Sequence, residues 1–390
     1  MNRKIVNVLL AKVLFLFLLP YNLLGQNADS LKIASVPTPV ATPVKYPQLQ
    51  FKGLFQARYL VGLTDNVDLN GLHHSDGDVT QNSFDIKRMR AQVRAKISER
   101  TEVVALVNLA DFKSDPKNKV LENAYLKYTF NNYFAITVGQ FRPWFGIEET
   151  YPVDIIKSMD FSNQYYEFGK NGWTSFQIGA SLTGAFDVGK LPITYAFSVV
   201  NGNGRNQEMD KDNGKQYSTR IVMGLSKKNN VNFGLNAGLG EVFKKEVYAF
   251  GADITADFQL TDRLFFETQM EAKQAINHNL YFSLPVDERT PYISNYQIRG
   301  FYFLPNLRYE IKYKKLSAIE FSCRYEYMDS NFRINSNIRQ TLVPMLGFEF
   351  LKDYGARIQL GLQIDRYKHT IDDTTTHNNN LLLLQVQSRL

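Results

Sequence analysis

The strongest chemical signal in the sequence is a column of cations in the segment 84–97. Alternate residues on one face of this segment are Arg88, Arg90, Arg94 and Lys96. The residues between them are apolar or small, so the charged face is opposed by a face that avoids water. Two interpretations remain open: the column is a path for small anions, or it is the ordinary polar lining of a water-filled space.

The charged face must meet water rather than lipid. Each Arg or Lys near a bilayer midplane costs about 2–4 kcal/mol, so the column facing lipid would cost on the order of 10 kcal/mol. This cost is comparable with the whole stability of a typical domain. Facing water, two cations about 6.7 Å apart along one strand repel by only about 0.6 kcal/mol. We infer that the charged face encloses solvent.

The elements that carry these side chains are strands. Apolar and polar residues alternate from Phe51 onward, as in a strand with two different faces. In the first segment, Phe51, Phe55 and Tyr59 alternate with Lys52, Gln56 and Arg58. About sixteen such segments are expected, beginning near residues 50, 83, 101, 120, 133, 173, 190, 215, 230, 245, 263, 293, 315, 339, 355 and 380. A tilted segment of about 11 residues spans the apolar band of a bilayer, which is about 25 Å tall.

The connections between these segments alternate in length. Tight turns such as 99–100 and 131–132 interleave mostly with long polar connections, which lie near 63–82, 143–172, 202–214, 278–292 and 369–379. Short turns at one rim and long loops at the other are typical of outer-membrane barrels. The sequence therefore predicts an all-β fold, a single transmembrane antiparallel β-barrel of about sixteen strands over residues 49–390, with a lumen wide enough for water.

The connection 143–172, after the fifth strand, mixes acids with apolar residues. This mixture favours a loop folded inward against the barrel wall, and an ordinary exposed loop is the alternative. Aromatic residues near strand ends, Phe141 and Tyr302 among them, are expected to form two girdles at the membrane interfaces.

The first 25 residues have the pattern of a secretory signal peptide. Arg3 and Lys4 precede an apolar stretch at residues 5–19, and Leu23-Leu24-Gly25 is a suitable cleavage site. The stretch is shorter than the roughly 20 residues that span a bilayer, and no cysteine follows to accept a lipid. Residues 26–48 contain four prolines and no hydrophobic periodicity, so we expect an extended leader there.

Composition excludes several classes of function. The net charge is +7, and removing the three cations of the signal peptide leaves +4, too little to indicate a nucleic-acid partner. Cys323 is the single cysteine, which excludes an intrachain disulfide and cysteine-rich metal sites. Because it lies on the apolar face of its segment, it is expected to be inert. The five histidines fall in expected loops or at strand ends without a nucleophile at a suitable spacing, so we predict no enzyme and no cofactor.

The segment His73–Asp78 contains imidazole and carboxylate groups that suit a divalent ion. A solvated loop tip explains the same residues, and on the sequence alone we predict no metal site.

Several stretches resemble the phosphate-selective porin O and P family, in the form common among Bacteroidetes-type outer membranes. These stretches are residues 84–90, 124–128, 139–146 (Gly-Gln-Phe-Arg-Pro-Trp-Phe-Gly), 195–204, 252–253 and 324–325. The resemblance implies a sixteen-stranded, usually trimeric porin with an arginine-lined pore that an inward loop narrows. Carried over by position, it implies that Arg88, Arg90 and Arg94 form an anion path and that Arg142 is a constriction residue.

We therefore expect an outer-membrane porin, exported by its signal peptide and assembled in lipid as a homotrimer, that passes small anions such as phosphate. The candidate lumen residues are Arg58, Arg88, Arg90, Arg94, Lys96, Arg142 and Arg324. Acids are expected to face the lumen as well: Asp253, Asp257, Glu267, Glu271, Glu320, Glu326 and Asp365. Two alternatives remain open: a general diffusion porin without selectivity, and a structural or adhesion barrel with a blocked lumen.

Overall fold

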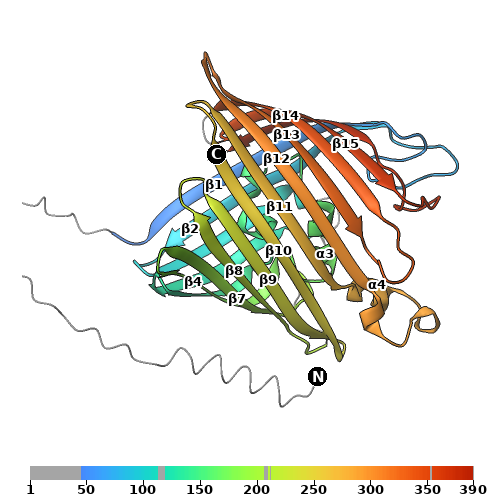
Figure 1. Cartoon of the computed structure of the whole chain (residues 1–390), viewed down its shortest axis with the longest axis horizontal. Helices are drawn as coiled ribbons and strands as arrows, with labels where there is room; N and C mark the ends of the chain where they lie inside the picture. The colour runs from blue at the N-terminus through green and yellow to red at the C-terminus, as the bar shows by residue number, and fades with distance from the viewer. Residues whose placement is uncertain (1–44, 113–118, 206–209, 211, 352–353, 390) are drawn as a thin grey trace, which may run out of the picture. The chain divides into compact units, whose positions relative to one another are not determined.

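Sixteen antiparallel strands form one closed barrel (Figure 1). The computed structural model describes residues 45–112, 119–205, 210, 212–351 and 354–389. The expected signal peptide and nearly all of the expected leader lie outside these residues. Each strand pairs with its neighbours in sequence, and β1 closes the ring against β16, from Leu54 opposite Arg389 to Gly62 opposite Leu381. The predicted barrel and its strand number are confirmed.

The observed strands begin within four residues of the expected positions. They are β1 (Gln48–Gly62), β2 (Asn82–Lys96), β3 (Thr101–Asn108), β4 (Leu121–Asn131), β5 (Phe134–Phe141), β6 (Gln177–Val188), β7 (Leu191–Val200), β8 (Gln216–Ser226), β9 (Val231–Val242), β10 (Lys245–Gln259), β11 (Leu264–Ile276), β12 (Gln297–Tyr313), β13 (Leu316–Asp329), β14 (Arg339–Leu351), β15 (Ala356–Tyr367) and β16 (Leu381–Arg389). Short helices occur in the connections: η1 (Leu109–Asp111), α2 (Ile147–Thr150), η2 (Val153–Ile155), α3 (Asn163–Lys170), α4 (His278–Ser283), η3 (Val286–Glu288) and η4 (Ile293–Asn295). No helix in the described part of the chain is both long enough and apolar enough to cross a bilayer.

The two rims of the barrel differ in their connections. One rim, here called the turn rim, carries only tight turns between strands, such as 132–133 and 314–315. The other, the loop rim, carries one tight turn at 243–244 and all the long connections, which are 63–81, 109–120, 142–176, 201–215, 277–296, 330–338 and 368–380. This asymmetry is the one expected from the sequence.

The outer face of the barrel is apolar and the inner face is polar. Phe51 and Phe84 on the outside are 71% and 84% exposed, whereas Glu271 and Gln359 on the inside are fully buried. This split follows from the period of two in a strand. It places the cation column of β2 inside the barrel, as expected from the free-energy cost of exposing these charges to lipid.

A β-bulge in β2 changes which residues face inward. Gln56 of β1 pairs with Arg88, but the next residue, Ala57, pairs with Ile86. An extra residue in one strand reverses the alternation beyond it. Lys87 therefore joins Arg88 on the inner side, where both contact Asp160.

Some of the expected girdle residues face inward instead, Phe141 and Tyr302 among them. Phe141 is 6% exposed and lines a cavity inside the barrel. Tyr302 is 1% exposed and packs against Ile147 and Leu304. Because Tyr302 and Phe303 are adjacent in one strand, only one of them can face outward.

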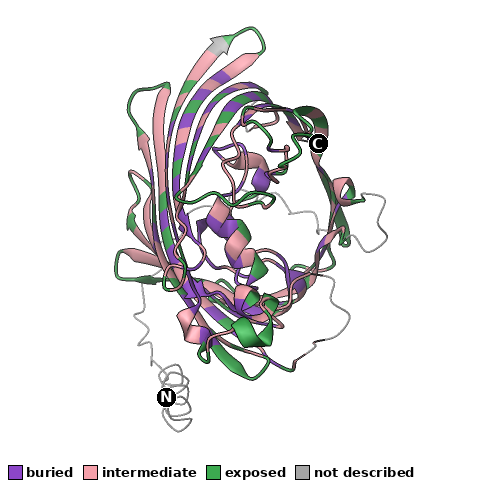
Figure 2. Cartoon of the chain, turned by 90° about the vertical axis from the view of Figure 1, so that its right-hand side faces the viewer, coloured by how far each residue is buried: buried purple, intermediate pink, exposed green. Residues whose placement is uncertain are grey.

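The connection 142–176, here called the folded-in loop, lies within the ring of strands (Figure 2). Inward-facing side chains of several strands hold its backbone. Gln387 of β16 donates a hydrogen bond to the Asp154 carbonyl at 2.9 Å, and Ser322 of β13 donates one to the Lys157 carbonyl at 2.5 Å. Each of the four buried apolar clusters among the described residues also includes a residue of this loop.

Apolar residues of the folded-in loop pack against both sides of the barrel. Phe161 and Tyr165 form a cluster with Leu54 of β1. Phe145, near the start of the loop, and Trp173, near its end, pack into a larger cluster that includes residues of β10, β11 and β12. The loop thus bridges the lumen, and both ends of the bridge are buried.

Glycines in the wall make room for this packing. A Cβ atom at Gly238 would come within 2.5 Å of the Trp173 ring, and one at Gly361 within 2.5 Å of Met159. Gly146, at the start of the loop, has φ of 105°, and a Cβ there would meet the Glu271 carboxylate. A glycine within a strand marks such a close approach.

Candidate functional site

Two cavities lie between the folded-in loop and the wall formed by β1 to β6. The first, the loop-side chamber, has a volume of about 620 Å³ and includes Asp68 and Asn70 of the connection 63–81. The second, the turn-side chamber, has a volume of about 500 Å³ and lies nearer the turn rim. Arg90 and Phe176 line both chambers, so these two residues mark the place where the chambers adjoin.

The two chambers differ in charge. Six cations line the turn-side chamber: Lys52, Arg90, Arg94, Lys127, Arg142 and Arg389. Only two carboxylates accompany them, Glu149 and Asp154. The loop-side chamber is nearly balanced, with the cations Arg58, Lys87, Arg88, Arg90 and Arg205 and the carboxylates Asp68, Asp85, Asp111 and Glu122. The excess of positive charge is therefore concentrated in the turn-side chamber.

Arg88, one of the predicted lumen residues, is 5% exposed and holds the folded-in loop. Its guanidinium donates to Asp160 Oδ1 at 2.7 Å and to Gln56 Oε1 at 2.9 Å. Lys87 contacts the other oxygen of Asp160 at 2.5 Å. Although burial alone would raise it, these two cations keep the pKa of Asp160 well below its usual range.

Arg90 stands at the boundary between the chambers. It forms an ion pair with Glu122, Nε to Oε2, at 2.7 Å. Arg205, from the connection between β7 and β8, approaches the other oxygen of Glu122 at 3.7 Å. Two guanidinium groups thus stand beside one carboxylate, and Arg205 also pairs with Asp111 at 2.9 Å. Arg58 forms an ion pair with Asp85 of the neighbouring strand.

Arg142 folds the start of the loop onto itself. It donates to Glu149 Oε2 at 2.7 Å and to the backbone carbonyl of Tyr151 at 3.2 Å. Its guanidinium also lies 5.2 Å from the ring centre of Phe161 and 5.6 Å from that of Tyr165. It lines the turn-side chamber, and its contacts give it a positioning role there.

Arg324 lies away from both chambers. It is 4% exposed and pairs with Glu326 at 2.7 Å. It also donates to the backbone carbonyls of Asp160 and Phe161, at 2.5 and 3.1 Å. The structure therefore surrounds it with the folded-in loop rather than with a cavity.

Arg94 and Lys96 are the accessible members of the predicted set. The Arg94 side chain is 39% exposed, and its contact with Glu102 is long, at 3.4 Å. Lys96 is exposed at the end of β2, where it forms no ion pair with any described residue. Both therefore keep charge available to solvent near the turn rim.

Sequence reasoning missed Lys52 and Lys127 as lumen candidates. Neither forms an ion pair within the described ranges, and both line the turn-side chamber. The signal was available, because each occupies the polar phase of its alternating segment. Arg205 and Arg389 lacked such a signal, since one lies in a loop and the other at the end of the last strand.

The acids expected in the lumen lie mainly on the opposite wall, where local cations neutralise most of them. Arg220 donates to both oxygens of Asp253, at 2.5 and 2.9 Å. Lys157 of the folded-in loop reaches Glu267 at 2.8 Å and Glu320 at 3.4 Å. These carboxylates form structural pairs rather than a row of free acids.

Comparisons with known proteins agree on the fold. Residues 61–273 match the family described as phosphate-selective porin O and P. The outer membrane channel DcaP of Acinetobacter baumannii is 13% identical, with a TM-score of 0.56 over 88% of this chain and 97% of that chain. The anion-selective porin from Comamonas acidovorans is 8% identical, with a TM-score of 0.54 over 88% and 100%. In-vitro folded OmpT of Vibrio cholerae, in its trimer form, is 10% identical, with a TM-score of 0.53 over 89% and 100%. No curated protein matches the sequence.

Proposed function

The chain belongs to the phosphate-selective porin O and P family and is an outer-membrane porin, and from this premise we propose that it passes small anions, phosphate among them, through the two chambers. The observation that carries the proposal is the charge of the turn-side chamber: six cations line it, and two of them, Lys52 and Lys127, form no ion pair with any described residue. A cavity lined mainly by charges of one sign raises the local concentration of ions of the opposite charge.

In this proposal, no single residue binds the anion tightly. Guanidinium groups suit oxyanions because they donate parallel hydrogen bonds. Arg90 already shares Glu122, so it offers a passing anion only a weakened site. Weak sites in series allow the ion to leave as readily as it enters.

We place the constriction where the chambers adjoin. Arg90, Glu122 and Arg205 supply charge there, and Phe176 supplies an apolar side. The Arg205 guanidinium lies 6.0 Å from the centre of the Phe176 ring, so the polar and apolar sides face each other. An anion would cross this point with two guanidinium groups nearby.

Ion selectivity is the direct test. In planar bilayers under a salt gradient, the wild-type reversal potential should indicate anion preference. Lys52→Gln combined with Lys127→Gln should move that potential toward cations, because it removes the two unpaired charges of the turn-side chamber. The matched control is Lys227→Gln with Lys228→Gln, which removes the same charge from an exposed turn. Equal potentials in wild type and in the Lys52/Lys127 variant would refute the proposal.

The choice of solute needs its own measurement. Phosphate added to a chloride current should reduce that current at concentrations where sulfate has less effect, if the path favours phosphate. Equal inhibition by both ions would leave an anion channel without phosphate preference. A conducting channel without ion preference would instead be a general diffusion porin, and no conductance would favour a structural or adhesion barrel.

We also propose that the barrel assembles as a homotrimer. The support is the trimer form of OmpT, which has the same fold. Mass measurement of the detergent-solubilised protein, corrected for bound detergent, should give three chains per particle. A single chain per particle would contradict this proposal without affecting the proposed ion path.

A further inference from the structure

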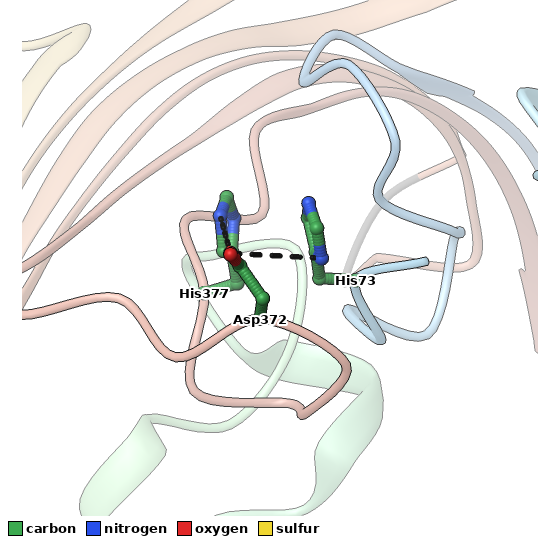
Figure 3. A group of neighbouring side chains, drawn as sticks. All are labelled: His73, Asp372 and His377. Atoms are coloured by element: carbon green, nitrogen blue, oxygen red, sulfur yellow. Dashed lines mark ion pairs between the residues drawn. The ribbon is translucent and has the colours of Figure 1, made fainter. Parts of the chain in front are cut away.

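The connections 63–81 and 368–380 bring two histidines and a carboxylate together at the loop rim (Figure 3). Ligand atoms of His73, Asp372 and His377 all lie within 4.8 Å of one another. The Asp372 carboxylate is 3.8 Å from His73 Nδ1 and 3.9 Å from His377 Nε2. We propose that these three residues bind a divalent transition metal, with Zn²⁺ the best match.

The ligand set fits this class of metal. Two imidazole nitrogens and one carboxylate oxygen are a common set for Zn²⁺, with a water molecule in the fourth position. Bonds of about 2.0–2.1 Å in a tetrahedron place neighbouring ligands about 3.3 Å apart. The three groups would therefore have to move together by roughly 1 Å or less. Ca²⁺ and Mg²⁺ prefer an all-oxygen site and fit poorly.

The two imidazole rings lie next to each other. Their centres are 4.5 Å apart and the rings are stacked, at an interplanar angle of 23°. A ring nitrogen binds a metal within the plane of its ring, so one of the two rings would turn out of this stack when both bind one ion. The backbone N–H of Asp373 donates to His73 Nδ1 at 3.2 Å, which indicates a lone pair on that nitrogen. The metal would replace this long hydrogen bond.

The surroundings hold the ligands near one another before any metal binds. The His73 N–H donates to the Thr374 carbonyl at 3.1 Å, and the Ser75 N–H donates to Asp373 Oδ1 at 2.8 Å. The side chains of His73 and His377 are only 12% and 16% exposed, whereas that of Asp372 is 71% exposed. The rings are thus mostly buried, and the exposed carboxylate leaves room for water on the open side of the metal.

A bound metal would join the first long connection of the barrel to the last. The ligands are separated by about 300 residues in sequence, but β1 and β16 are neighbours in the ring. A ligand that binds only the folded protein raises its stability. This inference does not depend on which ions cross the lumen.

The test is metal binding by the full-length protein in detergent, without a histidine tag. Calorimetry with Zn²⁺ should give one site per chain, and Co²⁺ should give the visible absorption of a tetrahedral site. His73→Ala and His377→Ala should each weaken Zn²⁺ binding by roughly tenfold or more. The controls are His74→Ala and His369→Ala, which remove histidines from the same two connections and should leave the affinity unchanged.

Folding of each variant is checked separately, by the mobility of the unheated protein in SDS gels. His377→Gln serves as a conservative variant if His377→Ala fails to fold. Zn²⁺ should also raise the unfolding temperature of wild type but not of either His377 variant. Absence of a stoichiometric site in wild type, or wild-type affinity in folded His73→Ala and His377→Ala, would overturn the proposal.

Discussion

Arginines with the same chemistry have different roles in this barrel. Arg324 and Arg88 are almost fully buried and hold the folded-in loop through Asp160. Arg94 is more exposed and lines a cavity. The difference comes from the position of each residue relative to the loop, since all three lie on the inner face of the barrel.

Removing Arg324 should loosen the loop. Arg324→Ala leaves Glu326 buried without its partner and frees the carbonyls of Asp160 and Phe161. Loss of one member of a buried ion pair costs about 3–5 kcal/mol. We expect a lower unfolding temperature and a noisier single-channel current. Arg94→Ala is the control, and a variant of Arg324 as stable as this control would contradict the anchoring role.

Glu148 should make docking of the folded-in loop depend on pH. Burial raises the pKa of this carboxyl to about 7, although Arg324 and Lys273 oppose the shift. The docked loop thus holds the proton more tightly than a loop released into water, where the carboxyl has its ordinary pKa. Its contribution to docking is complete below the ordinary pKa and is lost as the pH rises through about 7.

Current fluctuations should therefore increase between about pH 5 and about pH 8. Glu148→Gln should remove most of this dependence, because the amide is neutral throughout and is able to keep the contacts with Ser162. Glu167→Gln, at a carboxylate paired with exposed Lys170, is the matched control and should keep the dependence. A wild-type current that is equally quiet at both pH values would disprove the assignment.

At the scale of elements, the folded-in loop sets the free cross-section of the lumen. Deleting residues 150–165 removes the part that contacts β1, β13 and β16, so single-channel conductance should rise by roughly twofold or more, as expected when a constriction in a water-filled pore is removed. Deletion of 285–292, in another long connection of the loop rim, is the control and should leave conductance nearly unchanged. Equal conductance in the two deletions would exclude a constricting role for the folded-in loop.

Periodicity located the elements well because each strand has one dry and one wet face. It could not locate the bulge at Lys87, because an extra residue changes pairing without changing composition. It also could not assign Tyr302, because the inward face near the loop is apolar too. The apolar contacts between the folded-in loop and the inner wall are an exception to the rule that the inward-facing residues of such a barrel are polar.

The sequence predicted the cations of the candidate site but not the carboxylates that pair with them. The basic residues of β2 were identified from alternation, whereas their acidic partners come from the loop and from other strands. Asp160 and Glu122 are distant in sequence from the arginines that they neutralise. Such pairing depends on how the loop crosses the lumen, which local patterns do not specify.

At the scale of the whole molecule, the ring closes only through β1 and β16. A chain that ends before residue 381 would leave two strand edges unpaired, and open edges do not persist in a bilayer. We expect such a chain to fail to reach the compact form that resists SDS without heating. A truncated chain with wild-type mobility in unheated samples would contradict this expectation.

The pairing of the first strand with the last also imposes an order on biogenesis. The nine residues of β16 are made after every other strand, so no intermediate during synthesis can be sealed. Until β16 is made, one edge of β1 has no partner strand, although its other edge is able to pair with β2. Any factor that assists assembly must protect that edge of β1 until β16 is available.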